Sequence, residues 1–193
     1  CYAGAMSHAA ELSFRTAGAA DFAIISPNDP AAMTQYADEC RTIGLPYIFD
    51  PGQQCARMSG EELADGLGGA YMVICNDYEL ELLRQKTGLD EAAILDRGNR
   101  LVVTRGEHGS RVITRDGVVD VPAVMPRRIE DPTGVGDAYR GGFLKGLAHR
   151  ADLVVCARLG SVAATYALEH VGGQAHAYTW GEFRQRYEEH FGT

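Results

Sequence analysis

Short apolar runs alternate along the chain with longer stretches whose apolar side chains recur every three or four residues. The first pattern is typical of buried β-strands and the second of amphipathic α-helices. The predicted strands cover residues 21–25, 46–49, 71–75, 101–104, 111–114 and 118–121. The predicted helices cover residues 30–43, 77–86, 134–149, 151–170 and about 179–190. Strands and helices therefore alternate over most of the chain.

This alternation predicts βαβ units, in which consecutive strands run parallel and helices cover both faces of the sheet. Arg115-Asp116-Gly117 marks a hairpin turn between the last two predicted strands. We therefore predict one α/β domain over residues 1–193, built on a mostly parallel, doubly wound sheet. Because such sheets bind ligands at the carboxyl ends of their strands, we expect the functional site at that edge.

Charge and cysteine content narrow the choice of partners. The net charge is −8, and no stretch concentrates Lys and Arg. Nucleic acids and anionic membranes are bound through basic patches, so neither is expected as a partner. The five cysteines are odd in number, widely spaced and without a Cys-x-x-Cys pair, which argues against a disulfide framework or a zinc cluster. This pattern favours a reducing, cytoplasmic setting.

Residues 130–143, with the sequence EDPTGVGDAYRGGF, are the most informative segment. Gly134 and Gly136 bound a turn that leads into an amphipathic helix, and the free N–H groups at a helix start bind anions. Asp137 stands in the first turn, where a carboxylate can take the proton of a hydroxyl that attacks a phosphate. A dinucleotide-binding G-x-G-x-x-G would need glycine in place of Tyr139, and the Gly-Lys-Ser/Thr of a P-loop is absent.

The same residues also have a purely structural interpretation. Gly134 and Gly136 can form a tight turn into the helix, and Asp137 can simply complement the positive helix N-terminus. From the residue types and their spacing alone, both interpretations stay open.

The segment resembles the C-terminal signature of the PfkB family of carbohydrate and nucleoside kinases, the ribokinase-like kinases. That signature is an Asp-x-Thr-Gly-x-Gly-Asp pattern leading into a helix, and it is matched by residues 131–137. The resemblance implies a ribokinase-like fold with Asp137 as the catalytic base. It also implies that the backbone of Gly134, Val135 and Gly136 forms the anion hole for the transferred phosphoryl group.

Two groups of residues match the family's ion-binding positions. Residues 76–79 are similar to its Asn-x-x-Glu motif, which implies that Asn76 and Glu79 hold Mg²⁺ through water molecules. Asn followed three residues later by Glu is also a capping box, and both roles can hold at once. Asp131 and Thr133 match positions that bind a monovalent cation, such as K⁺, in many members.

The resemblance extends to the nucleotide and the acceptor. Residues 103–110 resemble the family's strand-end loop that cradles the phosphates and ribose of ATP, although their spacing also fits a glycine turn between strands. The implied nucleotide contacts are Thr104, Gly106, Gly109, Ala138 and Gly141. Asn28 falls where family members place a polar, substrate-facing residue at a strand end.

Together these resemblances imply an ATP- and Mg²⁺-dependent kinase that phosphorylates the hydroxymethyl group of a nucleoside or sugar. A homodimer is a further prediction, and the sequence leaves the oligomeric state open. The residues within several motifs resemble those of bacterial adenosine-kinase-like members.

The chain matches the C-terminal two-thirds of the family. Residues 1–6 resemble the end of the strand that returns from the family's lid to the main domain. The first strands and most of the β-sheet lid are therefore expected to be missing. The alternative is a non-catalytic nucleotide-binding module of the same fold, while the absent fingerprint disfavours an NAD-dependent enzyme.

Overall fold

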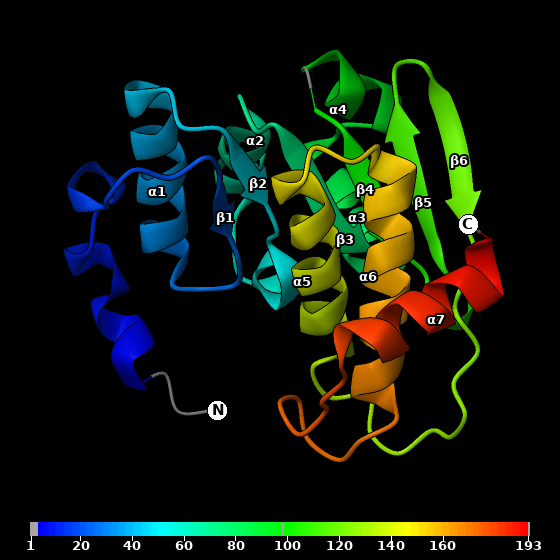
Figure 1. The fold of residues 1–193 in the computed structure, drawn as a ribbon. Helices are drawn as coiled ribbons and strands as arrows, with labels where there is room; N and C mark the ends of the chain where they lie inside the picture. Colours follow the sequence, from blue (N-terminus) through cyan, green and yellow to red (C-terminus); the bar gives the residue numbers. More distant parts are fainter. Residues whose placement is uncertain (1–3, 98, 193) are drawn as a thin grey trace. The chain divides into compact units, whose positions relative to one another are not determined.

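The computed structural model describes residues 4–97 and 99–192 (Figure 1). The chain divides into two compact units, each of which is described by itself. The first consists of residues 1–104 and 113–117, and the second of residues 105–112 and 118–193. The prediction of a single domain over residues 1–193 stays a prediction.

Six strands follow one another in the sheet in the order β1-β2-β3-β4-β5-β6. Their bounds are Ala23–Ile25, Tyr47–Phe49, Met72–Asn76, Leu101–Thr104, Ser110–Thr114 and Gly117–Val121. In the first unit β1 to β4 pair in parallel, with Ile25 opposite Phe49 and Asn76 opposite Thr104. The predicted α/β fold with a mostly parallel sheet is confirmed, and the register aligns the carboxyl ends of these strands.

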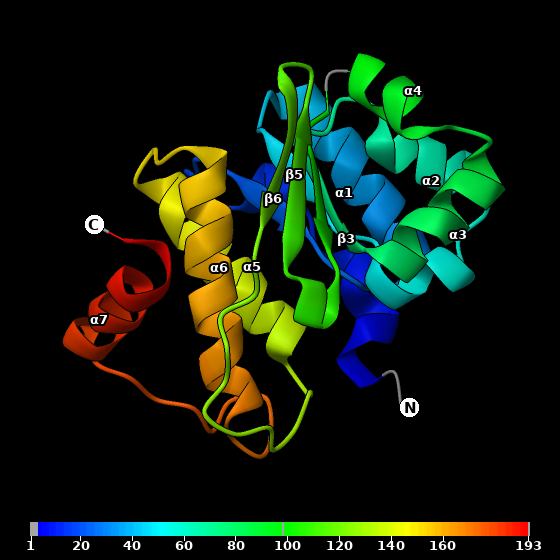
Figure 2. The ribbon, with the colours of Figure 1, turned by 90° about the vertical axis from the view of Figure 1, so that its right-hand side faces the viewer.

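The first unit packs its helices against the strands β1 to β4 (Figure 2). These helices are α1 (Pro30–Ile43), α2 (Gly60–Leu67), α3 (Asp77–Thr87) and α4 (Glu91–Asp96), with 3-10 turns at Gly4–Glu11, Phe14–Thr16 and Gly52–Ala56. The α1 helix begins where Asp29 accepts N–H groups of the first turn and Pro30 presets the backbone, and it ends at Gly44 in the left-handed conformation. Its bounds are those that the sequence predicts.

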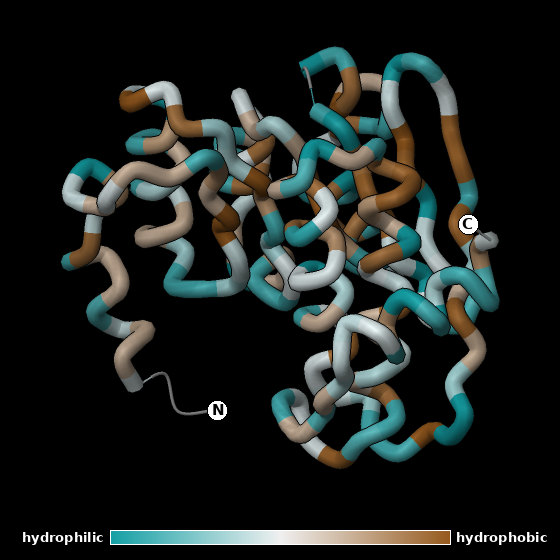
Figure 3. Tube along the Cα trace, viewed as in Figure 1, coloured by the Kyte–Doolittle hydropathy of each residue, from teal (hydrophilic) through white to brown (hydrophobic). Residues whose placement is uncertain are grey.

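The core of the first unit explains why its strands read as continuous apolar runs. Tyr47, Ile48 and Phe49 of β2 are all buried, as expected for a strand covered on both faces. Figure 3 shows hydrophobic colour along the strands and hydrophilic colour at exposed turns such as that between β5 and β6. Among the described residues, Cys40, Cys55, Cys75 and Cys156 are buried and form no disulfide, whereas Cys1 lies outside the described residues.

The second unit centres on two helices that lie side by side, α5 (Val135–Ala148) and α6 (Leu153–Leu168) (Figure 1). Glycines make their close approach possible. A methyl group at Gly142 would lie 2.5 Å from the carbonyl oxygen of Leu159, and one at Gly146 would lie 2.8 Å from the Cys156 sulfur. The helix α7 (Trp180–Phe191) begins at a capping box formed by Thr179 and Glu182 and packs on α6.

A buried ion pair joins the end of α6 to α7. Arg186 Nη1 lies 3.0 Å from Glu169 Oε2, and both side chains are more than nine-tenths buried. The other carboxylate oxygen of Glu169 accepts the N–H of Arg127 at 2.6 Å, and the Arg186 guanidinium stacks 4.1 Å from the centre of the Tyr166 ring. Each charge of the pair therefore has a partner inside the second unit.

The structure departs from the sequence-based prediction at three places. The helices α2 and α4 are not predicted, because six to eight residues show too little of the helical period. Residues 4–6, predicted to end a strand, belong instead to the 3-10 turn Gly4–Glu11, and residues 1–3 lie outside the described part of the chain. Within the described residues, no helix has the length and apolar character needed to cross a membrane.

Candidate functional site

The start of α5 is shaped to receive an anion. Gly134 is its N-cap residue, in the left-handed conformation with φ 77°, and no side chain caps the helix. The first intrahelical hydrogen bond runs from the Ala138 N–H to the Gly134 carbonyl at 2.9 Å. The N–H groups of Gly136 and Asp137 therefore precede the hydrogen-bonded ladder, where a helix N-terminus offers donors and a partial positive charge.

A second loop crosses this start at very short range. A methyl group at Gly134 would lie 2.6 Å from the Cα of Gly173, so the two backbones touch without any side chain between them. Asp131 holds the crossing together, because its two carboxylate oxygens accept the N–H of Thr133 at 2.8 Å and that of Gly172 at 2.9 Å. These hydrogen bonds, those from Thr133 first, keep the pKa of Asp131 below its ordinary value.

Substitution of Gly134 by Ala is expected to lower the phosphoryl transfer that the sequence resemblance predicts by about 10²-fold or more, because lost backbone donors of an anion hole cost that much. The added methyl meets the Gly173 backbone, and φ near +77° is unfavourable for alanine. Steady-state kinetics test this, with Gly181→Ala as control because its nearest atom would lie at 3.9 Å. Equal losses for both variants would contradict the close crossing as the cause.

The carboxylate of Asp137 is exposed from the first turn of α5, with 89% of its side chain accessible. The sequence interpretation missed the residue one turn further along, Arg140. Its Nη1 lies 3.9 Å from Asp137 Oδ1, and its side chain is only 18% exposed. The same nitrogen would be 2.7 Å from a methyl group at Gly136, so the guanidinium lies against the start of the helix. Arg140 thus adds a positive charge beside the free N–H groups.

The loop before β5 also belongs to the second unit. The Arg105 N–H donates to the Gly109 carbonyl at 2.7 Å, and the Gly109 N–H donates to the Gly106 carbonyl at 3.1 Å. Gly106 and Gly109 both have positive φ, and a methyl group at Gly109 would lie 2.1 Å from the carbonyl oxygen of Val121. Glycine is required at 109 by this approach, and the result is a closed turn with its backbone exposed.

In the first unit, the carboxyl edge of the sheet carries Asn76 and Glu79. They form the capping box that the spacing allows, in which Asn76 Oδ1 accepts the Glu79 N–H at 2.7 Å and Glu79 Oε2 accepts the Asn76 N–H at 2.9 Å. Thr104 lies opposite Asn76 on the neighbouring strand. The structural role of the pair is therefore confirmed, and its role toward Mg²⁺ stays a prediction.

The same edge contains an acidic residue that is not among the site residues predicted from the sequence. Asp50 follows β2 directly and is fully buried, and its Oδ2 accepts the Ser26 hydroxyl at 3.2 Å. Burial, followed by the negative charges of Glu79 and Asp50, raises the pKa of the Cys55 thiol to about 12. Asp50 and Glu79 thus lie close enough to the Cys55 thiol for both negative charges to raise its pKa. The sequence signal that could have identified Asp50 is its position directly after a buried strand.

The remaining predicted contacts are placed but not tested by the structure. Asn28 is half-buried three residues after β1, and its Oδ1 accepts the Asp29 N–H at 2.8 Å. Ala138 is half-buried on α5, and a methyl group at Gly141 would meet open space. Residues 131–141 and the loop 105–109 thus belong to the second unit, while the first unit holds Asn28, Asn76, Glu79 and Thr104.

Fold and site together define a class: an α/β protein with a parallel sheet, an uncapped glycine-flanked helix start for an anion, and a carboxylate beside it. The pfkB family of carbohydrate kinases matches residues 6–180. A nucleoside kinase of Methanocaldococcus jannaschii is 30% identical over 190 residues, which are 97% of this chain and 61% of that protein. The chain belongs to the pfkB carbohydrate kinase family.

Solved structures agree with this assignment. The Burkholderia thailandensis nucleoside kinase in complex with inosine has a TM-score of 0.94 and 38% identity, covering 97% of this chain and 61% of that one. The same kinase in complex with ADP-inosine has a TM-score of 0.95 over 98% of this chain and 59% of that one. The predicted ribokinase-like fold is thus confirmed, and the chain spans about 60% of the length of these relatives.

Proposed function

We propose that the protein transfers a phosphoryl group from ATP to the hydroxymethyl group of a nucleoside. The observation that carries this proposal is the start of α5, where free N–H groups, Asp137 and Arg140 stand together. The relatives described above support it, because one was solved with inosine and with ADP-inosine. A nucleoside acceptor is therefore favoured over a free sugar.

Each group at the start of α5 has a separate task in this reaction. In the proposed anion hole of Gly134, Val135 and Gly136, the Gly136 N–H is free of the helical ladder and the Val135 N–H donates to the Pro132 carbonyl at 3.3 Å, while the helix dipole adds stabilisation of the charge on the transferred phosphoryl oxygens. Asp137 takes the proton of the attacking hydroxyl, which makes the oxygen a better nucleophile. Phosphoryl transfer depends mainly on such positioning and charge stabilisation. Arg140 offsets the repulsion between the Asp137 carboxylate and the incoming phosphates.

Mg²⁺ and K⁺ belong to the proposal as cofactors. The capping box engages Oε2 of Glu79, which leaves Oε1 for the water shell of Mg²⁺, and oxygen ligands of this kind suit that ion. Bound there, Mg²⁺ would neutralise phosphate charge. Asp131 and Thr133 are the proposed neighbours of K⁺, although both Asp131 oxygens already accept backbone N–H groups. Activity with K⁺ replaced by tetramethylammonium tests the second ion separately.

Glu79→Gln is expected to raise the Mg²⁺ concentration needed for half-maximal activity severalfold while leaving the thermal midpoint nearly unchanged. Gln can still accept the Asn76 N–H and close the capping box, but it lacks the negative charge that attracts a hydrated cation. Activity is measured across a Mg²⁺ titration. Glu62→Gln, which alters the matching capping box of α2, is the control. An unchanged Mg²⁺ requirement for Glu79→Gln would contradict a role in Mg²⁺ binding and would indicate that Glu79 only caps the start of α3.

Adenosine is the acceptor that we propose first, and inosine, cytidine and ribose are the comparisons. A coupled assay of ADP formation with each acceptor, together with calorimetric titration of ADP, tests the whole proposal. Nucleotide binding without turnover of any acceptor would instead indicate a non-catalytic nucleotide-binding module. A homodimer and a cytoplasmic location also stay predictions, and size-exclusion chromatography checks the first.

A further inference from the structure

A buried hydrogen bond connects the helix that carries Asp137 to the loop that carries Gly106 and Gly109. The Tyr139 hydroxyl donates to the Ser110 Oγ at 2.9 Å, and the two residues are only 5% and 1% exposed. Ser110 is the first residue of β5 and follows Gly109 directly. The bond therefore joins two parts of the second unit that lie 29 residues apart in the chain.

The Ser110 end of this bond has little freedom to move. Gly109 lies so close to the carbonyl of Val121 that a methyl group would overlap it, and the Gly109 carbonyl accepts the Arg105 N–H. Arg105 in turn forms an ion pair with Asp120 at 2.6 Å. The position of the Ser110 hydroxyl thus follows the position of the whole loop.

The Tyr139 end is equally confined. A methyl group at Gly160 of α6 would lie 2.8 Å from the Tyr139 carbonyl oxygen and 3.0 Å from two ring carbons, so α6 closes directly on the ring. The ring also stacks with Phe143 at 6.2 Å between centroids. Burial raises the pKa of the Tyr139 phenol far above its ordinary value, so the phenol keeps its proton and its role as donor at neutral pH.

Helical geometry relates this anchor to the proposed base. At 3.6 residues per turn, residues two positions apart differ by about 200° around the axis, so Asp137 and Tyr139 point to opposite sides of α5. One side of the helix therefore carries the exposed carboxylate, and the other is fixed to the start of β5. A shift of the loop would be transmitted through the ring to the helix start.

We propose that the hydrogen bond between Tyr139 and Ser110 is a positioning link, which sets the nucleotide-binding loop 106–109 at a fixed place relative to the start of α5. This inference rests on the proposed kinase function, because it assigns the loop to ATP. Tyr139 and Ser110 touch neither phosphate nor acceptor in this scheme. They keep the phosphates of a nucleotide held by the loop in line with the free N–H groups beside Asp137.

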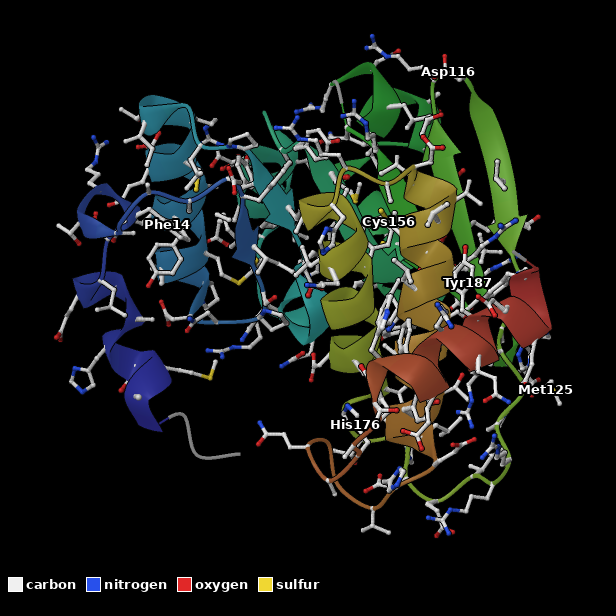
Figure 4. All side chains as sticks on the ribbon, in the orientation of Figure 1. Phe14, Asp116, Met125, Cys156, His176 and Tyr187 are labelled. Carbon is white, nitrogen blue, oxygen red and sulfur yellow. The ribbon has the colours of Figure 1, made fainter. Side chains whose placement is uncertain are left out.

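The test uses Tyr139→Phe, Ser110→Ala and the double variant, with Tyr187→Phe as control. Tyr187 lies on α7, as Figure 4 shows, and its ring packs against Phe191. Each single change leaves one buried hydroxyl without its partner, so we expect ADP affinity to fall roughly three- to thirtyfold and KM for ATP to rise with it. KM for the nucleoside and the control variant are expected to stay near the wild type.

The double variant separates positioning from simple packing. Removal of both hydroxyls leaves no unpaired group, so the thermal midpoint should return toward that of the wild type. Under our inference ADP affinity stays low, because the link is still absent. Recovery of both quantities, or unchanged ADP affinity in Tyr139→Phe, would overturn the inference while leaving the proposed function intact. A wild-type protein that binds no ADP would refute the proposed function itself.

Discussion

Replacement of Asp137 by Asn is expected to lower kcat by about 10²–10⁴-fold, the range that a general base contributes, with little change in ADP affinity. Asn is nearly isosteric and can still occupy the first turn of α5, so the N–H groups that we propose to receive phosphate are kept. The side chain is 89% exposed, so the substitution disturbs no core packing, and it weakens the 3.9 Å contact with Arg140. Kinetics and calorimetric ADP titration on the same preparation separate the two effects.

The matched control is Asp116→Asn, which removes one exposed carboxylate at the tip of the hairpin between β5 and β6, labelled in Figure 4. This control should keep wild-type kcat. Activity of Asp137→Asn within a few-fold of the wild type would remove Asp137 from the role of base. Loss of ADP binding in the same variant would instead indicate that the change disturbs the helix start.

Substitution of Arg186 by Met is expected to lower the free energy of unfolding by about 3–5 kcal/mol, because it leaves a buried charge without its partner. Glu169 would keep only the Arg127 N–H, and the cation–π contact with Tyr166 would also be lost. Met fills a similar volume, so the loss of charge pairing dominates. Urea unfolding followed by circular dichroism gives the free energy.

Two variants make this stability prediction specific. Arg184→Met removes an arginine from the same helix, but one that is 66% exposed and paired at 3.6 Å with Glu188, so a change of about 0.5 kcal/mol or less is expected. Adding Glu169→Gln to Arg186→Met removes the stranded charge while keeping an acceptor for Arg127, and should recover part of the loss. Equal destabilisation by Arg184→Met and Arg186→Met would contradict the burial argument.

The order of strands and long helices could be predicted because it is encoded locally. The α1 helix has both signals, Asp29-Pro30 before its first turn and Gly44 after its last. The sequence also contained an unused signal for α2, since Ser59 and Glu62 form a capping box. The apolar runs of β2, β3 and β4 predicted their positions to within two residues, because burial leaves a continuous hydrophobic segment.

Site features that depend on distant residues could not be predicted in this way. The hydrogen bond from Gly172 to Asp131 spans 41 positions, and the bond from Tyr139 to Ser110 spans 29. No local pattern marks such pairs, because each residue alone fits a turn or a core position. The motif predicted where the carboxylate and the glycines stand, while the contacts that hold them rigid became visible only in three dimensions.

The contact between Gly134 and Gly173 restricts protein engineering at one of its two positions. A methyl group at Gly134 would lie 2.6 Å from the Gly173 Cα, whereas one at Gly173 would lie 3.4 Å from the Gly134 Cα, an ordinary contact distance, so a library that varies Gly134 would consist mostly of disrupted helix starts. Directed evolution of this site is better served by holding Gly134 constant. Half-buried side chains such as Asn28 of the first unit are then the positions to vary.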